Sequence, residues 1–395
     1  RSFLLHVADF VKMTLRFSGV LDFQWGRASR MREKFRVAVI GHTGRGNYGH
    51  GLDTVWLDLP ECELLAVADA DERGRGAAAS RLKVQKAYAD YRNMLDEVKP
   101  DIVSIGPRWA DQHRDMVVEV ARRGIHIYLE KPMCRSLREA DEMIEACEKS
   151  GSKLAIAHQT RYSPRLQVVR ELLADDVIGE LLEIRGRGKE DHRGGGEDLW
   201  VLGSHVMNLI HQFGGEPKWC FAKMHQGGHL VTREDVQSGN EGLGPLAGDT
   251  VHAMFGLEGG KTAYFDSRRN AAGGRFGVQL FGSKGVLEIL TGHLPSVSLL
   301  RDPAWSPARS QQKWVPVTTA GVDRAEVLRD GGLHAGNLLA CRDLMEAIRD
   351  DRHPECSMYE GRWTVEMISG VFDSHRLGKP VSLPLENRDH PLTLI

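Results

Sequence analysis

The chain has 395 residues, of which 41% are hydrophobic and 27% charged, a balance typical of a globular protein with two domains of ordinary size. Lysine and arginine (52) nearly match aspartate and glutamate (54), so the net charge of −2 gives no electrostatic reason to expect nucleic acid or an anionic membrane as a partner. The six cysteines form no C-x-x-C pair and no run of about 18 apolar residues occurs, which argues against a zinc knuckle, a disulfide framework and a membrane span.

The N-terminal segment, "RSFLLHVADFVKMTLRFSGVLDFQWGRASR", begins without Met. Met31 directly precedes the first expected strand, so we interpret residues 1–33 as an extension outside the fold. A clipped twin-arginine export signal is the alternative for "RSFL", although polar and charged residues between positions 6 and 16 interrupt any apolar core. Scattered single cysteines fit a reducing compartment, and we therefore expect a cytoplasmic protein.

Strands and helices are expected to alternate over residues 34–158. The β-branched and apolar runs predict buried strands at 35–40, 63–71, 101–106, 125–130 and 153–158. Helical patterns occupy 111–124 and 136–151, and the second begins with a capping box formed by Ser136 and Glu139. This alternation predicts an α/β domain, a parallel sheet with helices on both faces.

From residue 159 to 395 the pattern becomes α+β. Strand-like segments occur at 181–190, 218–226, 250–269, 275–291 and 296–301, several joined by short glycine-rich turns. They predict a mostly antiparallel open sheet. We expect one helix at 196–213, with an apolar stripe on one face, and a loop at 227–248, which has turn composition.

The segment "GHTGRGNYG" follows the first strand and indicates a dinucleotide site. The first glycine of such a site directly follows the strand, so we assign the pattern to Gly41, Thr43 and Gly46 rather than to the literal G-x-G-x-x-G at 44–49. Thr43 departs from the pattern, and Gly44 beside it can restore clearance for a pyrophosphate. We expect a helix N-terminus to follow and to hold that pyrophosphate. With Arg45, these residues are the candidate cofactor contacts of the turn.

Asp69 ends the second expected strand, where an acid accepts hydrogen bonds from the adenosine ribose. A 2′-phosphate there would meet like charge, which favours NAD over NADP and makes 34–158 a Rossmann NAD(P)-binding domain. Alternatively, Asp69 and Asp71 only begin the next loop, and Arg73 and Arg75 leave NADP open.

The segment "IHIYLEKPMCRS" is the most specific in the chain. Glu130-Lys131-Pro132, after a buried strand, resembles the E-K-P signature of the Gfo/Idh/MocA oxidoreductases, the family of glucose–fructose oxidoreductase and inositol dehydrogenase. "TRYSP" (160–164), the segment 194–208 and the C-terminal 378–392 agree in order, so the resemblance covers about residue 34 to 395. It implies an NAD cofactor, a sugar, cyclitol or related polyol as substrate, and a C-terminal domain for substrate binding and oligomerisation.

The resemblance also implies roles for single residues. Lys131 would be catalytic, since a lysine at a strand's carboxyl end can donate to a substrate hydroxyl, and its bond to Pro132 is typically cis in the family. A surface lysine at a strand end is the alternative. Pro107, His113 and Glu130 would lie, with Lys131, on the cofactor side.

His205 is the second candidate catalytic residue, as a general base for a hydroxyl proton. The family's D-x-G-x-H-x-x-D reads Val201 to Asn208 here, so the histidine is kept and both acids are missing. Asp198 could replace the first acid's contact with substrate, but it lies roughly 10 Å from His205 along a helix. Candidate substrate-binding residues are Arg161, Tyr162, Asp198 and Asn208; for the first two, a salt bridge at the domain junction is the alternative. No spacing matches a metal motif, and we expect no metal.

These features together predict an NAD-dependent oxidoreductase acting on CH–OH groups, and a homo-oligomer (dimer or tetramer), because an apolar open sheet face would need cover. Two alternatives remain open. One is an NAD-dependent glycosidase or eliminating enzyme that oxidises the sugar transiently, and the other is a regulatory protein that senses NAD or sugar without turnover.

Overall fold

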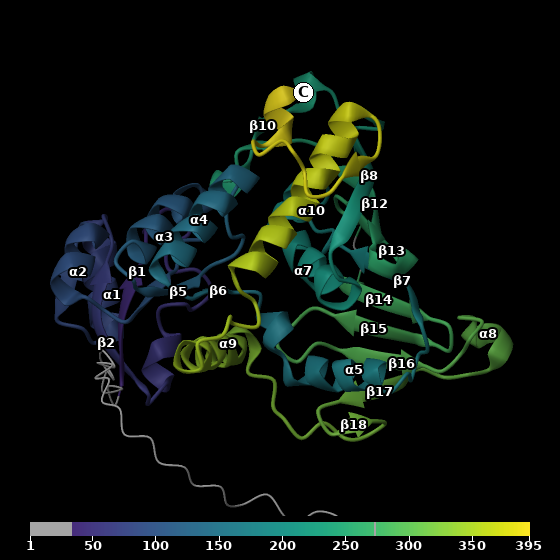
Figure 1. Ribbon diagram of the computed structural model, residues 1–395, viewed down its shortest axis with the longest axis horizontal. Helices are drawn as coiled ribbons and strands as arrows, with labels where there is room; N and C mark the ends of the chain where they lie inside the picture. The colour runs from purple at the N-terminus through teal and green to yellow at the C-terminus, as the bar shows by residue number, and fades with distance from the viewer. Residues whose placement is uncertain (1–33, 272–273) are drawn as a thin grey trace, which may run out of the picture. The chain divides into compact units, whose positions relative to one another are not determined.

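The computed structural model describes residues 34–271 and 274–395 (Figure 1), so the extension predicted at 1–33 lies outside the described residues. The first part of the described chain forms a parallel sheet in the order β3-β2-β1-β4-β5-β6. Its strands are β1 Phe35–Ile40, β2 Cys62–Ala68, β3 Lys86–Tyr88, β4 Ile102–Ile105, β5 His126–Leu129 and β6 Leu154–Ile156. From β1 the sheet grows first toward β2 and β3 and then, from β4 on, toward the opposite edge. Sheets of this order bind dinucleotides at the switch point between β1 and β4.

Helices cover both faces of this sheet, as predicted. One face packs against α2 (Tyr91–Val98), α3 (His113–Ala121) and α4 (Leu137–Ser150). The other packs against α1 (Glu72–Leu82) and against α9 (Gly332–Arg349), which comes from far along the chain. The capping box of α4 forms only in part: the Ser136 side chain accepts from Glu139 N, but the Glu139 carboxylate accepts from Arg135 N instead.

The helix expected directly after β1 is not formed, which corrects the prediction of a helix N-terminus for the pyrophosphate. Turns follow Gly41, and the next helical segment is the short 3-10 helix η1 (Val55–Asp58). Gly44, Gly46, Gly49 and Gly51 all have φ between +62° and +86°, a conformation that cannot continue a right-handed helix. The side chains of Leu344 and other residues of α9 pack where a crossover helix would have covered the sheet.

The second sheet of the described chain is mostly antiparallel, with one parallel pair between β7 and β13. Its order is β18-β17-β16-β15-β14-β7-β13-β12-β8-β19, with β9 beside β8. The bounds are β7 Leu181–Arg187, β8 Pro217–Gln226, β9 His229–Leu230, β12 Thr250–Leu257, β13 Thr262–Arg268, β14 Gly277–Gly282, β15 Val286–Leu290, β16 Val297–Leu300, β17 Val315–Thr318, β18 Gly321–Val322 and β19 Val381–Ser382. The helices α7 (Gly203–Gly214) and α10 (Met358–Leu377) pack against this sheet, and α5 (Pro164–Ala174) contacts β17 (Figure 1).

Two predictions in this half need correction. The single helix expected at 196–213 is broken at Leu202 into α6 (Gly196–Val201) and α7, where Gly203 is so close to the Phe265 ring that a Cβ would lie 2.9 Å from it. The segment 227–248 is not a plain loop. It carries β9, the 3-10 turns η4 (Arg233–Asp235) and η5 (Asn240–Gly242), and the ribbon β10 (Gln237–Ser238) with β11 (Pro245–Leu246).

Part of the open face of the second sheet is polar, whereas an apolar face was expected. A groove of about 730 Å³ runs over it, and charged or polar side chains dominate its lining: Glu183, Arg185, Arg187, Glu190, Tyr264, Asp266, Arg275, Gln279 and Glu288. The groove therefore lacks the apolar surface on which the expectation of an oligomer was based.

Candidate active site

Lys131 lies at the carboxyl end of β5, and only 6% of it is exposed. The Lys131–Pro132 bond is cis, as the resemblance implied. The Lys131 ammonium donates to the carbonyl oxygen of Val201 at 2.6 Å. This carbonyl is free because the helix breaks at Leu202, and the N–H of His205 bonds to Leu202 O instead. The break between α6 and α7 thus supplies the acceptor that holds the lysine.

Burial lowers the pKa of the Lys131 ammonium from its usual range. The carboxylates of Glu130 and Glu241 oppose that change, while Arg193 and Arg108 add to it. Glu241 comes from η5 in the segment 227–248, and its carboxylate lies 3.9 Å from the Arg108 guanidinium in the loop after β4. This segment therefore brings a charge of the second domain to the lysine.

His205 faces the same region from α7. Its Nδ1 lies 3.4 Å from Nδ1 of His158, and the two rings are perpendicular with centroids 5.0 Å apart. The ring edge also meets Phe276, at 6.4 Å between centroids. Burial lowers the pKa of His205 well below its usual value, and His158, Lys131 and His50 add to the effect. His205 is therefore a neutral imidazole, the form that can accept a proton.

Glu130 fixes the backbone that carries Lys131. The carboxylate is fully buried and accepts from the N–H of Lys131 (3.2 Å), the N–H of His50 (3.2 Å) and Nδ1 of His50 (3.1 Å). Burial alone would raise the pKa of this carboxyl, but the hydrogen bonds from His50 and the Lys131 charge hold it below its usual range. A Cβ on Gly49 would lie 2.5 Å from Glu130 Oε2, which explains the glycine.

Both glycine registers of the loop after β1 have a structural basis. A Cβ on Gly41 would overlap the Tyr48 ring, and a Cβ on Gly46 would overlap the backbone of Arg108. Gly46 and Gly49 also have positive φ, whereas Gly41 does not. The literal motif at 44–49, which the sequence analysis set aside, is thus required for the loop to pack against the ends of β4 and β5.

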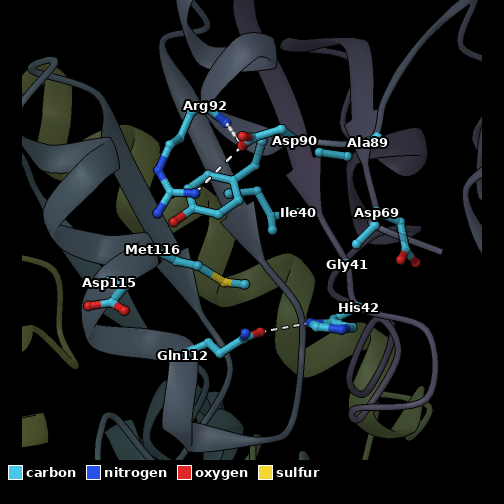
Figure 2. Close-up of a pocket in the computed structure, with 13 residues that line it drawn as sticks. Ile40, Gly41, His42, Asp69, Ala89, Asp90, Arg92, Gln112, Asp115 and Met116 are labelled. Atoms are coloured by element: carbon cyan, nitrogen blue, oxygen red, sulfur yellow. Dashed lines mark hydrogen bonds and ion pairs between the residues drawn. The ribbon is translucent and has the colours of Figure 1, made fainter.

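Asp69 uses its carboxylate to tie this loop to β2. It accepts from Thr43 N (3.0 Å), Thr43 Oγ1 (2.7 Å), Tyr48 OH (2.9 Å) and Asp71 N (3.0 Å). Figure 2 shows the carboxylate directed away from Asp90 and Arg92. The hydroxyl of Thr43, which departs from the glycine pattern, therefore has a partner of its own.

A cavity of about 280 Å³ opens at the carboxyl ends of β1 and β2 (Figure 2). Its walls include Ile40, Gly41, His42, Asp69, Asp90, Tyr91, Arg92, Gln112, Asp115 and Met116. The apolar and aromatic walls suit an adenine base. The carboxylates of Asp69, Asp90 and Asp115 outnumber the guanidinium of Arg92, and this excess of negative charge disfavours a 2′-phosphate. The cavity therefore fits the adenosine of NAD. Arg45, also predicted here, pairs with Asp111 and stacks over Trp109 at 4.3 Å.

His113 is fully buried and joins the two loops that flank this site. Its Nε2 lies 2.7 Å from Pro107 O and its Nδ1 lies 2.9 Å from Pro132 O. The predicted pair Pro107 and His113 thereby braces the cis turn that carries Lys131.

The four candidate substrate residues hydrogen-bond within the protein. Arg161 donates to Glu355 O at 2.7 Å and reaches Asn208 at 3.5 Å, while the Tyr162 hydroxyl donates to Cys356 O at 3.4 Å. Asn208 also donates to Thr364 Oγ1 at 3.3 Å. These contacts join η3 (Gln159–Tyr162) and α7 to the start of α10 and the residues before it, and Arg161 also forms an ion pair with Glu355 at 3.6 Å. Substrate binding by these residues stays a prediction.

Asp198 is fully buried beneath the second sheet. Its Oδ2 accepts from Ser267 Oγ at 2.6 Å and from Glu190 N at 3.2 Å, and its Oδ1 has no partner. Burial raises the pKa of this carboxyl. The structure therefore brings Lys131 and His205 together but gives Asp198 contacts of its own.

Sequence reasoning missed three side chains of the site: His50, His158 and Glu241. His158 had a usable signal, because it lies two residues after the buried strand β6, as Lys131 does after β5, and carboxyl ends of parallel strands share one edge. His50 lies inside the glycine loop, where the glycines form the recognisable pattern. Nothing in the local pattern marked Glu241.

The described residues, 34–271 and 274–395, contain no group of three or more His, Cys, Asp or Glu that could hold a metal ion. Within the same ranges, no helix has both the length and the apolar character needed to cross a membrane.

Two family models match the chain. Residues 35–158 match one described as an oxidoreductase family with an NAD-binding Rossmann fold, and residues 166–288 match the Gfo/Idh/MocA C-terminal domain. The chain is 31% identical over 147 residues to D-apiose dehydrogenase of Paraburkholderia graminis, which covers 37% of this chain and 38% of the relative. It is 26% identical over 259 residues to myo-inositol 2-dehydrogenase of Thermotoga maritima, 63% of this chain and 73% of the relative. The matched part thus spans less than half of the first relative.

Solved structures share the fold across both domains. An NAD-binding oxidoreductase from Klebsiella pneumoniae has a TM-score of 0.69 at 20% identity, covering 89% of this chain and 100% of that one. Levoglucosan dehydrogenase in complex with NADH has a TM-score of 0.72 at 18% identity, covering 89% and 99%.

Proposed function

Because the chain belongs to the Gfo/Idh/MocA family of NAD-binding oxidoreductases, we propose that it oxidises a secondary alcohol of a sugar, cyclitol or related polyol. The observation that supports this most directly is that the buried Lys131 ammonium, held on the carbonyl of Val201, lies near enough to His205 for its charge to help keep that imidazole neutral. A hydrogen-bond donor and a proton acceptor on one substrate oxygen are what alcohol oxidation requires of the protein.

Bound NAD supplies the hydride acceptor. The Lys131 ammonium donates a hydrogen bond to the substrate oxygen and stabilises the negative charge that develops as the hydroxyl loses its proton. The carbonyl of Val201 and the carboxylate of Glu130 hold Lys131 in place for this role. His205 accepts the hydroxyl proton on its imidazole, which burial keeps neutral.

A panel of sugars and inositols, scored for NADH absorbance after the cofactor content of the purified protein is recorded, tests the activity. On the substrate found, Lys131→Met should lower kcat about 10²- to 10⁴-fold, the usual contribution of such a group. Lys149→Met removes an exposed lysine of α4 and serves as the control. Wild-type kcat in Lys131→Met would exclude the proposed role.

The same panel separates the two alternatives. Bond cleavage without net NADH would indicate transient oxidation; cleavage of a glycoside is what the name of a similar protein, glycosyl hydrolase family 109 protein 1 of Akkermansia muciniphila, suggests. NAD binding without turnover of any compound would favour a sensor.

Two further parts of the proposal concern assembly and location. The groove over the second sheet carries both acidic and basic side chains, which supports pairing with a second copy, and light scattering of the purified protein tests it. All six cysteines are buried free thiols, which supports a cytoplasmic location, and cell fractionation tests that.

A further inference from the structure

The acids that flank the histidine in the family pattern are missing here, so the orientation of His205 needs another source. Among the described residues, the side-chain hydrogen-bond partner of His205 is His158, at 3.4 Å between the two Nδ1 atoms. Position 208, which carries the second acid of the pattern, holds an asparagine directed to Thr364 and Cys356. The base is therefore held by an imidazole rather than a carboxylate.

His158 is a rigid partner. It is 2% exposed, its N–H bonds to Ile156 O at 2.8 Å, and its carbonyl accepts from Arg161 N at 3.0 Å. Burial, together with the charges of Lys131 and Arg161, lowers the pKa of His158 to about 3. The ring is neutral at any pH where the protein works and carries a single N–H.

A contact between two Nδ1 atoms holds one proton, so one ring donates and the other accepts. If His158 donated, His205 would carry its own proton on Nε2 and could not receive another there. If His205 donates, its Nε2 keeps a lone pair before the reaction. The same Nδ1–H still donates to His158 after Nε2 has taken a proton, so no tautomer has to change during the step.

We propose that His158 is a positioning residue for the base: its Nδ1 accepts from Nδ1–H of His205, which leaves Nε2 of His205 free for the substrate. In the step, the substrate O–H bond breaks and an N–H bond forms at Nε2, while the carbinol hydride passes to NAD. This inference rests on the proposed function only for the step itself, because the tautomer is a property of the protein without substrate.

The charges around the pair define a second consequence. Lys131 and Arg161 carry positive charge beside the pair, and the carboxylate of Glu130 is engaged by His50 and by the backbone of Lys131. His205 therefore becomes an imidazolium without a carboxylate beside it. Replacing His158 by an acid should make that cation easier to form and raise the pH at which the base is lost.

The test combines a spectrum with kinetics. In protein labelled with ¹⁵N-histidine, without substrate and at neutral pH, we expect His205 to show a protonated Nδ1 and an unprotonated Nε2. The signals are assigned by their loss in His205→Gln. A protonated Nε2 in His205 would overturn the proposal, whether or not any sugar is turned over.

Given a substrate, His158→Leu should lower kcat about 10- to 100-fold with little change in KM, as expected when a base loses its orientation. His158→Asn, whose Oδ1 can accept the same hydrogen bond, should restore most of it, and His158→Asp should raise the acidic pKa of the kcat/KM profile. His126→Leu is the control, because His126 also accepts a hydrogen bond through Nδ1, from Lys153 N at 3.0 Å, but at the opposite end of β5. Unchanged kcat in His158→Leu, or an unmoved acidic limb in His158→Asp, would refute the role.

Discussion

Replacing Gly46 by alanine should destabilise the protein more than the same change at Gly44, although their backbones are alike. The φ angles are +86° and +83°, so alanine pays the same left-handed penalty of about 1–2 kcal/mol at both positions. Only Gly46 is crowded: its Cβ would lie 2.8 Å from Arg108 Cα and closer still to Arg108 N, while nothing lies within 4 Å of a Cβ on Gly44. Displacing a backbone neighbour adds about 1–3 kcal/mol.

Urea unfolding of the two variants without NAD measures this difference. We expect a loss of about 1–2 kcal/mol for Gly44→Ala and of about 2–5 kcal/mol for Gly46→Ala. Titration with NAD should then show weakened binding in Gly46→Ala, because the loop has to move away from Arg108. Equal free energies of unfolding for the two variants would show that the loop does not pack against Arg108 as described.

Three further predictions concern ionisable groups. His158 has a pKa of about 3 in the folded protein and about 6.5 in the unfolded chain, so its protonation favours the unfolded chain. The free energy of unfolding should therefore fall by about 2 kcal/mol from pH 7 to pH 5. In urea titrations of His158→Asn, this fall of about 2 kcal/mol should be absent. Tyr48→Phe removes one donor to Asp69 and should cost about 1 kcal/mol by the same method, and no loss would mean that this bond is not formed. Glu241 raises the pKa of Lys131, so Glu241→Gln should move the alkaline limb of kcat/KM to lower pH, and an unmoved limb would contradict their proximity.

The sequence alone was sufficient for five of the six parallel strands and for Lys131, whereas the short edge strand β3 (Lys86–Tyr88) was not predicted. The run Phe35–Ile40 is a strand with the predicted bounds, because a β-branched apolar run has few other stable conformations in a parallel sheet. The second strand ends at Ala68, before the predicted end at residue 71, because Asp69 turns its carboxylate to the loop after β1 and Asp71 caps α1. Glu130-Lys131-Pro132 lies at the strand end as expected, since local hydrophobicity defines where the strand stops.

The glycine loop shows where local patterns fail. A strand followed by glycines predicted a helix, yet positive φ at successive glycines keeps the chain in turns. The helix at 196–213 had a continuous apolar stripe, yet it breaks at Leu202, next to Gly203, which packs against the ring of Phe265 on β13. The spacing of apolar residues shows which face of a helix is apolar, but it does not show how closely a strand from another part of the chain approaches that helix.

What the sequence determined by itself is therefore the set of elements whose cause lies within a turn or a strand: five of the parallel strands, the helices α3 and α4, and the lysine after β5. Tertiary structure alone decided that α9 covers the sheet face left open after β1, and that His158 meets His205 across 47 residues of chain. Both are contacts between segments that share no local pattern. Only the folded chain, which places buried faces and strand ends beside each other, can bring them within reach.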